Sequence, residues 1–321
     1  MRKMTALGVG LALLWTVVPA FAVTPKSTDR ELEGRLEAAL KNDRVLHSVR
    51  LEVVDGERRD PESMVVYGSG VGIWEHVRQF QATEKQVRKA LRLLERSDFT
   101  SMPDRVKGPR PANAEEGGEP DATVLVRFVT LSVGELSKTV VQDNKAYPLE
   151  SFEELCHDLV KIFRKAARHG VEASSLADGI AKLATGTLAP EVLQVLVSAP
   201  EQRALPSQQG QGWLLRIEGG VVEVRSHSVD GGFGPEIRRP LTPELAREIA
   251  GWLETAHVSS LPQNLYDAGY TDLTVEVLGR EKSLQAREFS GRDPAAEAAA
   301  RGSFRTLRDH FESLATSMLK R

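Results

Sequence analysis

The chain contains two segments that align with each other without a gap, and this internal repeat limits the folds open to it. Thr83–Pro103 reads TEKQVRKALRLLERSDFTSMP, and Thr242–Pro262 reads TPELAREIAGWLETAHVSSLP, at an offset of 159 residues. Each segment begins with a threonine, continues with apolar residues at helical spacing and ends in a proline, which blocks continuation of a helix. The repeat therefore predicts two copies of one structural module.

The start of each repeated helix carries a capping pattern. Thr83 is followed three residues later by Gln86, as in a capping box, and Thr242 precedes Pro243, which suits the first position of a helix. The apolar positions that define the two helices are Val87, Ala90, Leu91 and Leu94 in the first copy, and Leu245, Ile249, Trp252, Leu253 and Ala256 in the second.

The similarity extends to strands on both sides of this helix. Before it, Tyr67–Val71 matches Ile217–Val221 at an offset of 150, and each reads as a glycine-containing turn between two strands. After it, alternating apolar and polar residues lead in each copy to a glycine, Gly134 or Gly279, at an offset of 145. Return strands are expected near Ser137–Gln142 and Lys282–Phe289.

A second helix is expected to close each copy. Ser151 and Glu154 form another capping-box pattern at the start of the first closing helix. The matching apolar residues, at an offset of 152, are Phe152, Leu155, Leu159 and Ile162 in the first copy, and Phe304, Leu307, Phe311 and Leu314 in the second.

The changes of offset locate two insertions. The rise from 150 to 159 gives the second copy nine additional residues before its first helix, and His227–Pro235 is the natural place for them. The fall from 159 to 145 gives the first copy fourteen additional residues after its helix, within Asp104–Asp121. That second stretch is rich in proline, glycine and charge, which favours a loop.

These elements predict an α+β fold built from two divergent copies of a module, each with a mostly antiparallel sheet and two helices packed on one face. Short helices are expected at Thr28–Leu40, around Ser174–Ala184 and around Pro190–Val197. The boundaries expected along the chain are a signal peptide at 1–22, an N-terminal helical segment at 23–45, module copy 1 at 46–168, a helical linker at 169–208 and module copy 2 at 209–321.

The first residues have the three parts of a secretory signal. Arg2 and Lys3 precede an apolar run from Thr5 to Val18, and Ala20 and Ala22 are the small residues of a cleavage site. The run is shorter than the roughly 20 residues of a membrane span, although an uncleaved anchor is the alternative. We expect cleavage after Ala22 and a periplasmic or secreted protein with no stable membrane span.

Composition narrows the classes of partner. Hydrophobic residues make up 41% of the chain, enough for packed cores. Loss of the two cations of the signal changes the formal charge from −3 to −5, which gives no field for nucleic acid. Cys156 is the single cysteine, so no internal disulfide forms.

The sequence patterns that resemble catalytic or ligand-binding motifs are explained here by ordinary structural roles. Gly68, Gly70 and Gly72 lie in a hairpin turn rather than a phosphate loop, because a strand-like segment follows instead of a helix. Cys156 and His157 are adjacent on a helix and point in different directions, so a buried, inert thiol is favoured over a catalytic pair. The seven histidines lack metal-binding spacing, and we predict no catalytic residue, metal or cofactor.

Two short patterns resemble known families. Tyr67-Gly68-Ser69-Gly70 is similar to the "YGDG"-like turn of a domain family of unknown function found in exported bacterial proteins, although the cysteines typical of that family are missing. Gly231-Gly232-Phe233-Gly234 is similar to the "GGFAG"-like loop of the emfourin-like inhibitors of metalloproteases, in the second copy alone. The second resemblance implies protease inhibition.

These observations favour an exported, non-catalytic binding module whose partner is an unknown protein or envelope component. The expected contact residues are Gly231, Gly232, Phe233 and Gly234, because an aromatic on a copy-specific loop suits partner contact. For the Phe233 side chain itself, a plug tucked into its own domain is the favoured interpretation, and partner contact is the alternative. Two other functions remain open: a periplasmic hydrolase with a dispersed active site, and a structural protein of the cell envelope.

Overall fold

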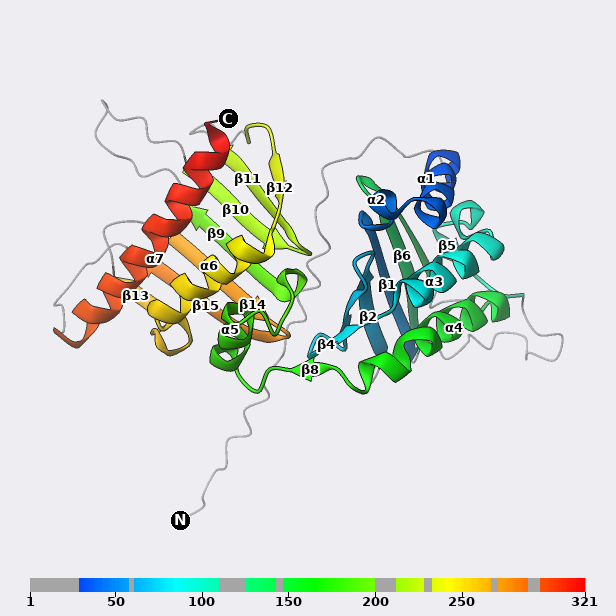
Figure 1. Cartoon of the computed structure of the whole chain (residues 1–321), viewed down its shortest axis with the longest axis horizontal. Coiled ribbons are helices and arrows are strands. Elements are labelled where there is room, and N and C mark those ends of the chain that lie inside the picture. Colours follow the sequence, from blue (N-terminus) through cyan, green and yellow to red (C-terminus); the bar gives the residue numbers. More distant parts are fainter. Residues whose placement is uncertain are drawn as a thin grey trace, which may run out of the picture.

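The computed structural model describes residues 29–57, 61–109, 125–142, 147–199, 212–227, 233–266, 271–287 and 295–320. Within these ranges the chain forms seven α-helices and two mostly antiparallel sheets of eight and seven strands (Figure 1). The α+β class and the two similar sheet modules predicted from the sequence are therefore confirmed. The expected signal peptide lies outside the described residues.

The first sheet has the strand order β5-β7-β6-β1-β2-β3-β4-β8. Its strands are β1 (Val49–Glu57), β2 (Glu62–Tyr67), β3 (Val71–Trp74), β4 (Arg78–Gln81), β5 (Arg105–Val106), β6 (Leu125–Val133), β7 (Leu136–Gln142) and β8 (Val171–Glu172). The helices of this module are α1 (Asp29–Lys41), α2 (Asp43–Leu46), α3 (Glu84–Arg96) and α4 (Glu150–Ala167).

The second sheet has the strand order β12-β11-β10-β9-β14-β15-β13. Its strands are β9 (Leu193–Ala199), β10 (Gly212–Glu218), β11 (Val221–His227), β12 (Ile237–Pro240), β13 (Asn264–Tyr266), β14 (Thr271–Val277) and β15 (Arg280–Arg287). The helices of this module are α5 (Leu176–Ala184), α6 (Pro243–Thr255) and α7 (Ala295–Leu319).

Read outward from β1 and β9, the two strand orders match strand for strand, except that β8 at the edge of the first sheet has no counterpart. The segment 169–208, expected to be a helical linker, supplies both α5 and β9 to the second module. The helix expected around Pro190–Val197 is wrong: only Pro190–Val192 forms a 3₁₀ turn, and a strand follows. Leu193, Val195 and Val197 are buried in alternation, and this period of two belongs to a strand.

Besides its two repeated helices, each module has a helix that was expected outside the repeat, α1 near Thr28–Leu40 and α5 near Ser174–Ala184. α1 packs on α3 in the first copy, and α5 packs on α6 in the second. The end of α1 is held by Arg88 of α3, whose guanidinium donates to the carbonyl oxygens of Ala39 and Leu40 at 3.2 and 2.6 Å. These contacts satisfy helix-end acceptors that have no partner within the helix.

The first hairpin turn of each module shows that the alignment of the two copies at an offset of 150 is wrong by one residue on one side of the turn. β2 and β3 are joined by the three residues Gly68–Gly70, whereas β10 and β11 are joined by Gly219 and Gly220 alone. Both of these glycines have positive φ, at 58° and 78°, as the tightest hairpin turns require. The offset of 150 therefore holds after the turn, but before it Tyr67 corresponds to Glu218 rather than Ile217.

Two of the three predicted helix caps are present. The Thr83 side chain accepts from the Gln86 backbone and Gln86 returns the contact, and Thr242 accepts from the backbone of Leu245. The cap predicted at Ser151 is wrong, because α4 begins at Glu150 and Leu149 is the residue before it. Ser151 therefore lies inside the first turn of the helix, where its backbone is already helical.

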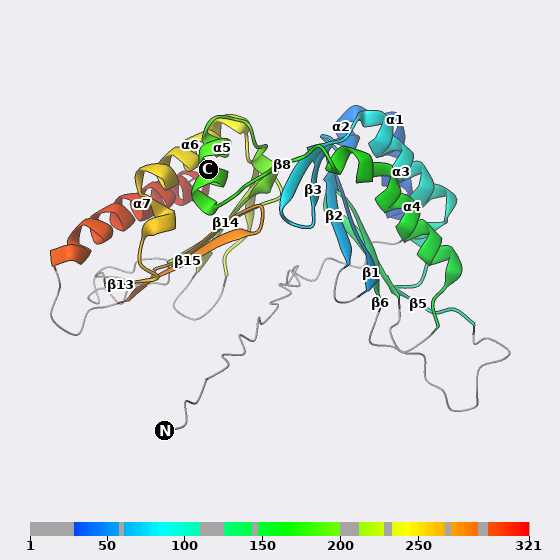
Figure 2. The ribbon, with the colours of Figure 1, turned by 90° about the horizontal axis from the view of Figure 1, so that it is seen from below.

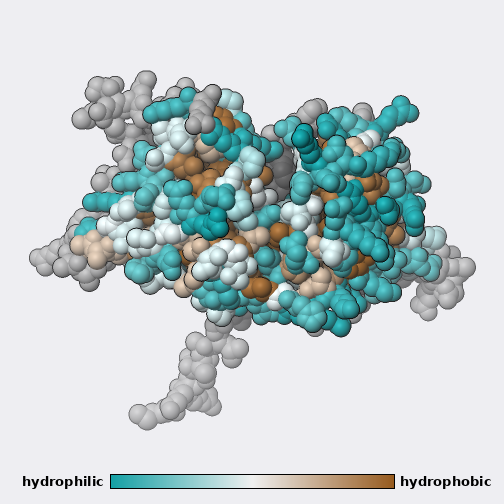
Figure 3. Space-filling model, in the orientation of Figure 1, coloured by the Kyte–Doolittle hydropathy of each residue, from teal (hydrophilic) through white to brown (hydrophobic). Residues whose placement is uncertain are grey.

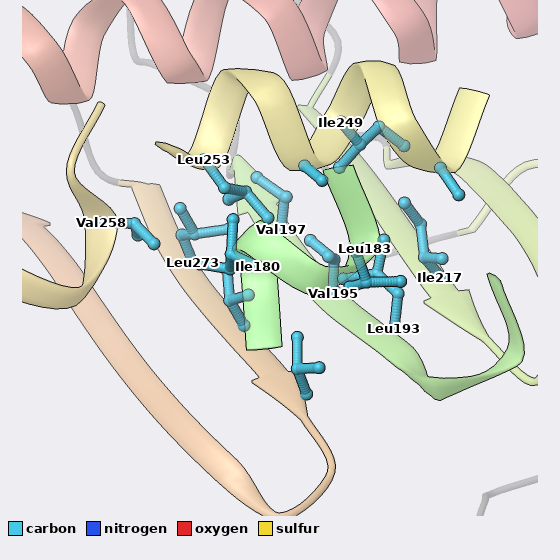
Figure 4. Close-up of a cluster of buried hydrophobic side chains, with 14 of the residues drawn as sticks. Ile180, Leu183, Leu193, Val195, Val197, Ile217, Ile249, Leu253, Val258 and Leu273 are labelled. Carbon is cyan, nitrogen blue, oxygen red and sulfur yellow. The ribbon is translucent and has the colours of Figure 1, made fainter. Parts of the chain in front are cut away.

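Each sheet buries one face against its helices. Figure 4 shows side chains of α5, α6, β9 and β14, including Ile180, Ile249, Val195 and Leu273, meeting in one cluster of the second module. Phe99, Phe152 and Phe163 are among the fully buried side chains of the first module. Hydrophilic side chains cover much of the opposite, outward side of the helices (Figure 3).

The modules meet through the face of the first sheet that its own helices leave uncovered (Figure 2). Val65, Tyr67, Val71 and Ile73 point to this face, are each less than 10% exposed, and belong to the apolar cluster of the second module. Burial raises the pKa of Tyr67 to about 12. At the rim, Ser69 Oγ donates to Glu191 Oε1 at 2.9 Å.

The two predicted insertions lie largely outside the described residues. The connection between β5 and β6 runs from residue 107 to 124, whereas its counterpart between β13 and β14 runs from 267 to 270, in agreement with fourteen additional residues in copy 1. The connection between β11 and β12 is longer than that between β3 and β4, as expected. None of the described helices is long and apolar enough to cross a membrane.

Candidate functional site

The β11–β12 connection contains the contact residues expected from the sequence. Gly231 and Gly232 lie outside the described residues. Phe233 is 58% exposed. Among the described residues, no other large hydrophobic residue has so high an exposed fraction. The backbone of Gly234 donates to the Ser226 carbonyl at 2.9 Å and ties this segment to β11. Phe233 is therefore more than half exposed to solvent.

Charged side chains fix the strand that follows Phe233. Glu236 pairs with Arg225 on β11 and with Arg238 on β12. Arg238 also contacts Glu223 at 3.0 Å across the strand pair. The exposed aromatic thus precedes the edge strand β12, which ion pairs hold against β11.

A second candidate site lies in the first module, at the end of the layer between the sheet and α4. Asp55 on β1 and Arg127 on β6 are directly opposite each other in the antiparallel register. Both have the parity of the helix-facing residues, because Val53 and Val129 are also opposite each other and are fully buried. Glu153, near the start of α4, contacts the same guanidinium, so two strands and a helix position the cluster.

Arg127 is the centre of this cluster. Its Nε donates to Asp55 Oδ1 and its Nη2 donates to Glu153 Oε1, both at 2.7 Å. The Arg127 side chain is only 7% exposed, and its Nη1 is buried without a hydrogen-bond partner in the described structure. A buried donor left without an acceptor is unfavourable by about 1–3 kcal/mol, more for a charged group.

The cluster borders a cavity of about 430 Å³, lined by Asp55, Arg127, Glu153, Glu154, His157 and Asp158. A neighbouring hollow of about 310 Å³ between α3 and α4 shares Asp158 and is lined by Lys89, Arg92, Arg96 and Lys161, among others. Around the first cavity four carboxylates face one guanidinium and one imidazole. The cavity is therefore acidic, although the basic hollow offsets part of the Asp158 charge.

Neither Cys156 nor His157 forms a nucleophile and base pair here. The Cys156 side chain is fully buried, and burial together with the nearby Asp55 carboxylate raises the pKa of the thiol. This bears out the buried thiol expected from the sequence. His157 Nδ1 lies 3.9 Å from Asp55 Oδ2, too far for a hydrogen bond. The described residues that line the cavity include no serine, threonine or cysteine.

The second module builds the same corner without charges on its strands. The register that pairs Ser198 with Asp272 places Ala199 opposite Thr271, at the positions that correspond to Asp55 and Arg127. On the closing helix, Arg305 stands at the position of Glu153. The fold therefore does not require a buried ion pair at this place.

Comparisons with known proteins add no family to this description. No protein-family model matches the chain, and no curated protein matches it. Within the described residues, no three histidine, cysteine, aspartate or glutamate side chains are grouped so that they could hold a metal ion.

The sequence did not single out Asp55 and Arg127, because they are 72 residues apart and belong to no motif. One signal was present in the strand pattern. Each residue continues the alternation of buried valines, Val53 to Asp55 and Val129 to Arg127. Charges of opposite sign at inward-facing positions of two strands are unusual. They can be found by noting which residues of each strand alternate with the buried valines.

Proposed function

We propose that this protein is an exported binding protein that captures a protein partner through the β11–β12 connection, with Phe233 as the central contact. The proposal rests on the 58% exposure of Phe233 in an insertion that the first copy lacks. Aromatic residues contribute strongly to protein interfaces because they bury a large area with little loss of conformational freedom. The emfourin-like pattern Gly231–Gly234 suggests a secreted metalloprotease as the partner.

Binding is favoured over hydrolysis by the chemistry of the described cavity. Hydrolysis through an acyl intermediate needs a hydroxyl or thiol nucleophile within reach of a base, and the described residues that line the cavity with His157 supply neither. A structural role in the envelope would instead place most of the protein with wall or membrane material. Cell fractionation separates that role from capture of a soluble partner.

The test is affinity capture with the mature chain that begins at Val23, using its own periplasm or culture medium, followed by mass spectrometry and an inhibition assay with any protease recovered. Phe233→Ser should abolish capture. Leu196→Ser is the matched control, because Leu196 is also exposed, at 43%, but lies on the open sheet face. Equal capture by the wild type and Phe233→Ser, with both folded by circular dichroism, would contradict the proposal.

A further inference from the structure

We propose that the acidic cavity of the first module is a second binding site, which takes the lysine or arginine side chain of a peptide together with a neighbouring backbone carbonyl. This proposal is independent of the one made for Phe233. The residues that form the site are Asp55, Arg127, Glu153, Glu154, His157 and Asp158.

The charge balance selects the sign of the ligand. Arg127 already contacts Asp55 and Glu153, so its single positive charge faces two carboxylates before Glu154 is counted. Glu154 is exposed at the cavity and has no cation of its own in the lining. A cationic group that enters the cavity is attracted by this surplus, and a free carboxylate or phosphate is repelled.

The unpartnered Nη1 of Arg127 indicates a second chemical group that the ligand should carry. This atom is a donor that needs an acceptor oxygen. It is buried in the wall of the cavity that Arg127 lines, so an entering acceptor reaches it when the Arg127 side chain shifts. Because four carboxylates surround the cavity, a neutral carbonyl is a better acceptor than another anion. A basic residue in a peptide supplies both parts, with an ammonium or guanidinium group on its side chain and a carbonyl on its backbone.

Size and divergence support the same conclusion. A volume of about 430 Å³ holds one long side chain with its backbone, and is within the range typical of small-ligand pockets. In the second copy, the positions of Asp55 and Arg127 are held by Ala199 and Thr271, which give no buried ion pair. The charges thus distinguish one copy from the other, as expected of a binding site rather than a requirement of the fold.

The test titrates the full mature chain with Nα-acetyl-lysine N-methylamide, observed by heteronuclear NMR at about 0.15 M salt, where long-range attraction is screened. Saturable shifts are expected for amides around Glu153–Asp158. Nα-acetyl-norleucine N-methylamide, which lacks the charge, and butylamine, which lacks the carbonyl, should each bind more weakly. Equal binding of the norleucine probe would overturn the charge argument, and equal binding of butylamine would overturn the carbonyl argument.

Paired variants assign the effect to the cavity. Glu154→Gln with Asp158→Asn should weaken the lysine probe about tenfold, the order expected when charged contacts are lost. Glu248→Gln with Glu312→Gln is the matched control, because it removes two exposed carboxylates from the second copy and should change nothing. Equal weakening by both pairs would mean non-specific attraction and would refute the site.

The role of Arg127 is tested by giving the first copy the residues of the second. Asp55→Ala combined with Arg127→Thr should fold, as shown by a single cooperative thermal transition, and should remove the preference for the lysine probe over butylamine. Retention of that preference in the folded variant would overturn the role of Nη1. Phe233→Ser should bind the lysine probe as the wild type does, so the two proposals fail or succeed separately.

Discussion

Asp98 and His257 occupy the same position of the two copies, two residues after the ends of α3 and α6, and both have a φ of 50°. This left-handed conformation follows the end of each helix, where glycine is the usual residue because it has no Cβ. Each module therefore keeps a strained residue at this point. The chain direction after both helices depends on it, because the 3₁₀ turns Phe99–Ser101 and Val258–Ser260 begin at the next residue.

Replacing His257 with glycine should stabilise the protein by about 0.5–1 kcal/mol. The left-handed conformation costs a residue with a side chain about 1–2 kcal/mol, and the greater freedom of glycine in the unfolded chain returns part of that gain. Asp98→Gly should gain less, because aspartate tolerates this conformation better. Urea unfolding measures both. Ser97→Gly, one residue earlier at a φ of −87°, is the control and should destabilise.

The buried pair should show strong non-additivity. Asp55→Ala alone or Arg127→Thr alone should cost about 3–5 kcal/mol, because each leaves an uncompensated buried charge. The double variant should lie within about 1 kcal/mol of the wild type, since a buried pair is often replaced without loss. Chemical denaturation of all four proteins gives the coupling energy. Additive losses would show that the two charges do not compensate each other.

The capping box of α3 should be measurable by substitution. Thr83→Ala should lower the free energy of unfolding by about 1 kcal/mol, because it removes the acceptor for the Gln86 backbone. Ser151→Ala is the informative comparison. The sequence shows the same pattern there, but Ser151 makes no cap, so the change should be small. Equal losses at the two sites would contradict the observed start of α4.

Asp178 should titrate at unusually low pH. Its side chain accepts from the Lys182 ammonium and from the Ser174 backbone, and these hydrogen bonds lower its pKa from 3.8 to about 2. Because the folded pKa lies below the unfolded one, this stabilisation is present above pH 3.8 and is lost as the pH falls toward 2. NMR titration measures the pKa directly. Lys182→Met should raise it, whereas Lys161→Met on α4 should leave it unchanged.

Elements were predicted best where the spacing of apolar residues fits either a strand or a helix, and less well where it fits both. The alternation of apolar and polar residues in Leu273–Leu278 predicts a strand, and β14 forms there, at Thr271–Val277. The run from Val192 to Val197 fits a helix as well as a strand, because its apolar residues satisfy both spacings. Pairing with β10 and β14 decides for the strand, and no local pattern contains that information.

The candidate sites divide in the same way. The insertion around Phe233 was predictable, because a comparison of the two copies reveals unequal lengths. The cavity was not, because Asp55 meets Arg127 only through the register of β1 with β6. The glycines of the β6–β7 and β14–β15 turns show the same limit. Gly134 is the first residue of its turn and Gly279 the second, so alignment on glycine misplaces the strands by one residue.

The contact that buries Val65, Tyr67, Val71 and Ile73 has a consequence for the history of the chain. An ancestral single module with this apolar strip would have exposed it to water, and two such modules could have associated through it. In the present chain the second copy covers this strip. Expressed without its cover, the first copy should self-associate, and the two copies should unfold in a single step. A protein duplicated in this way can no longer lose either half.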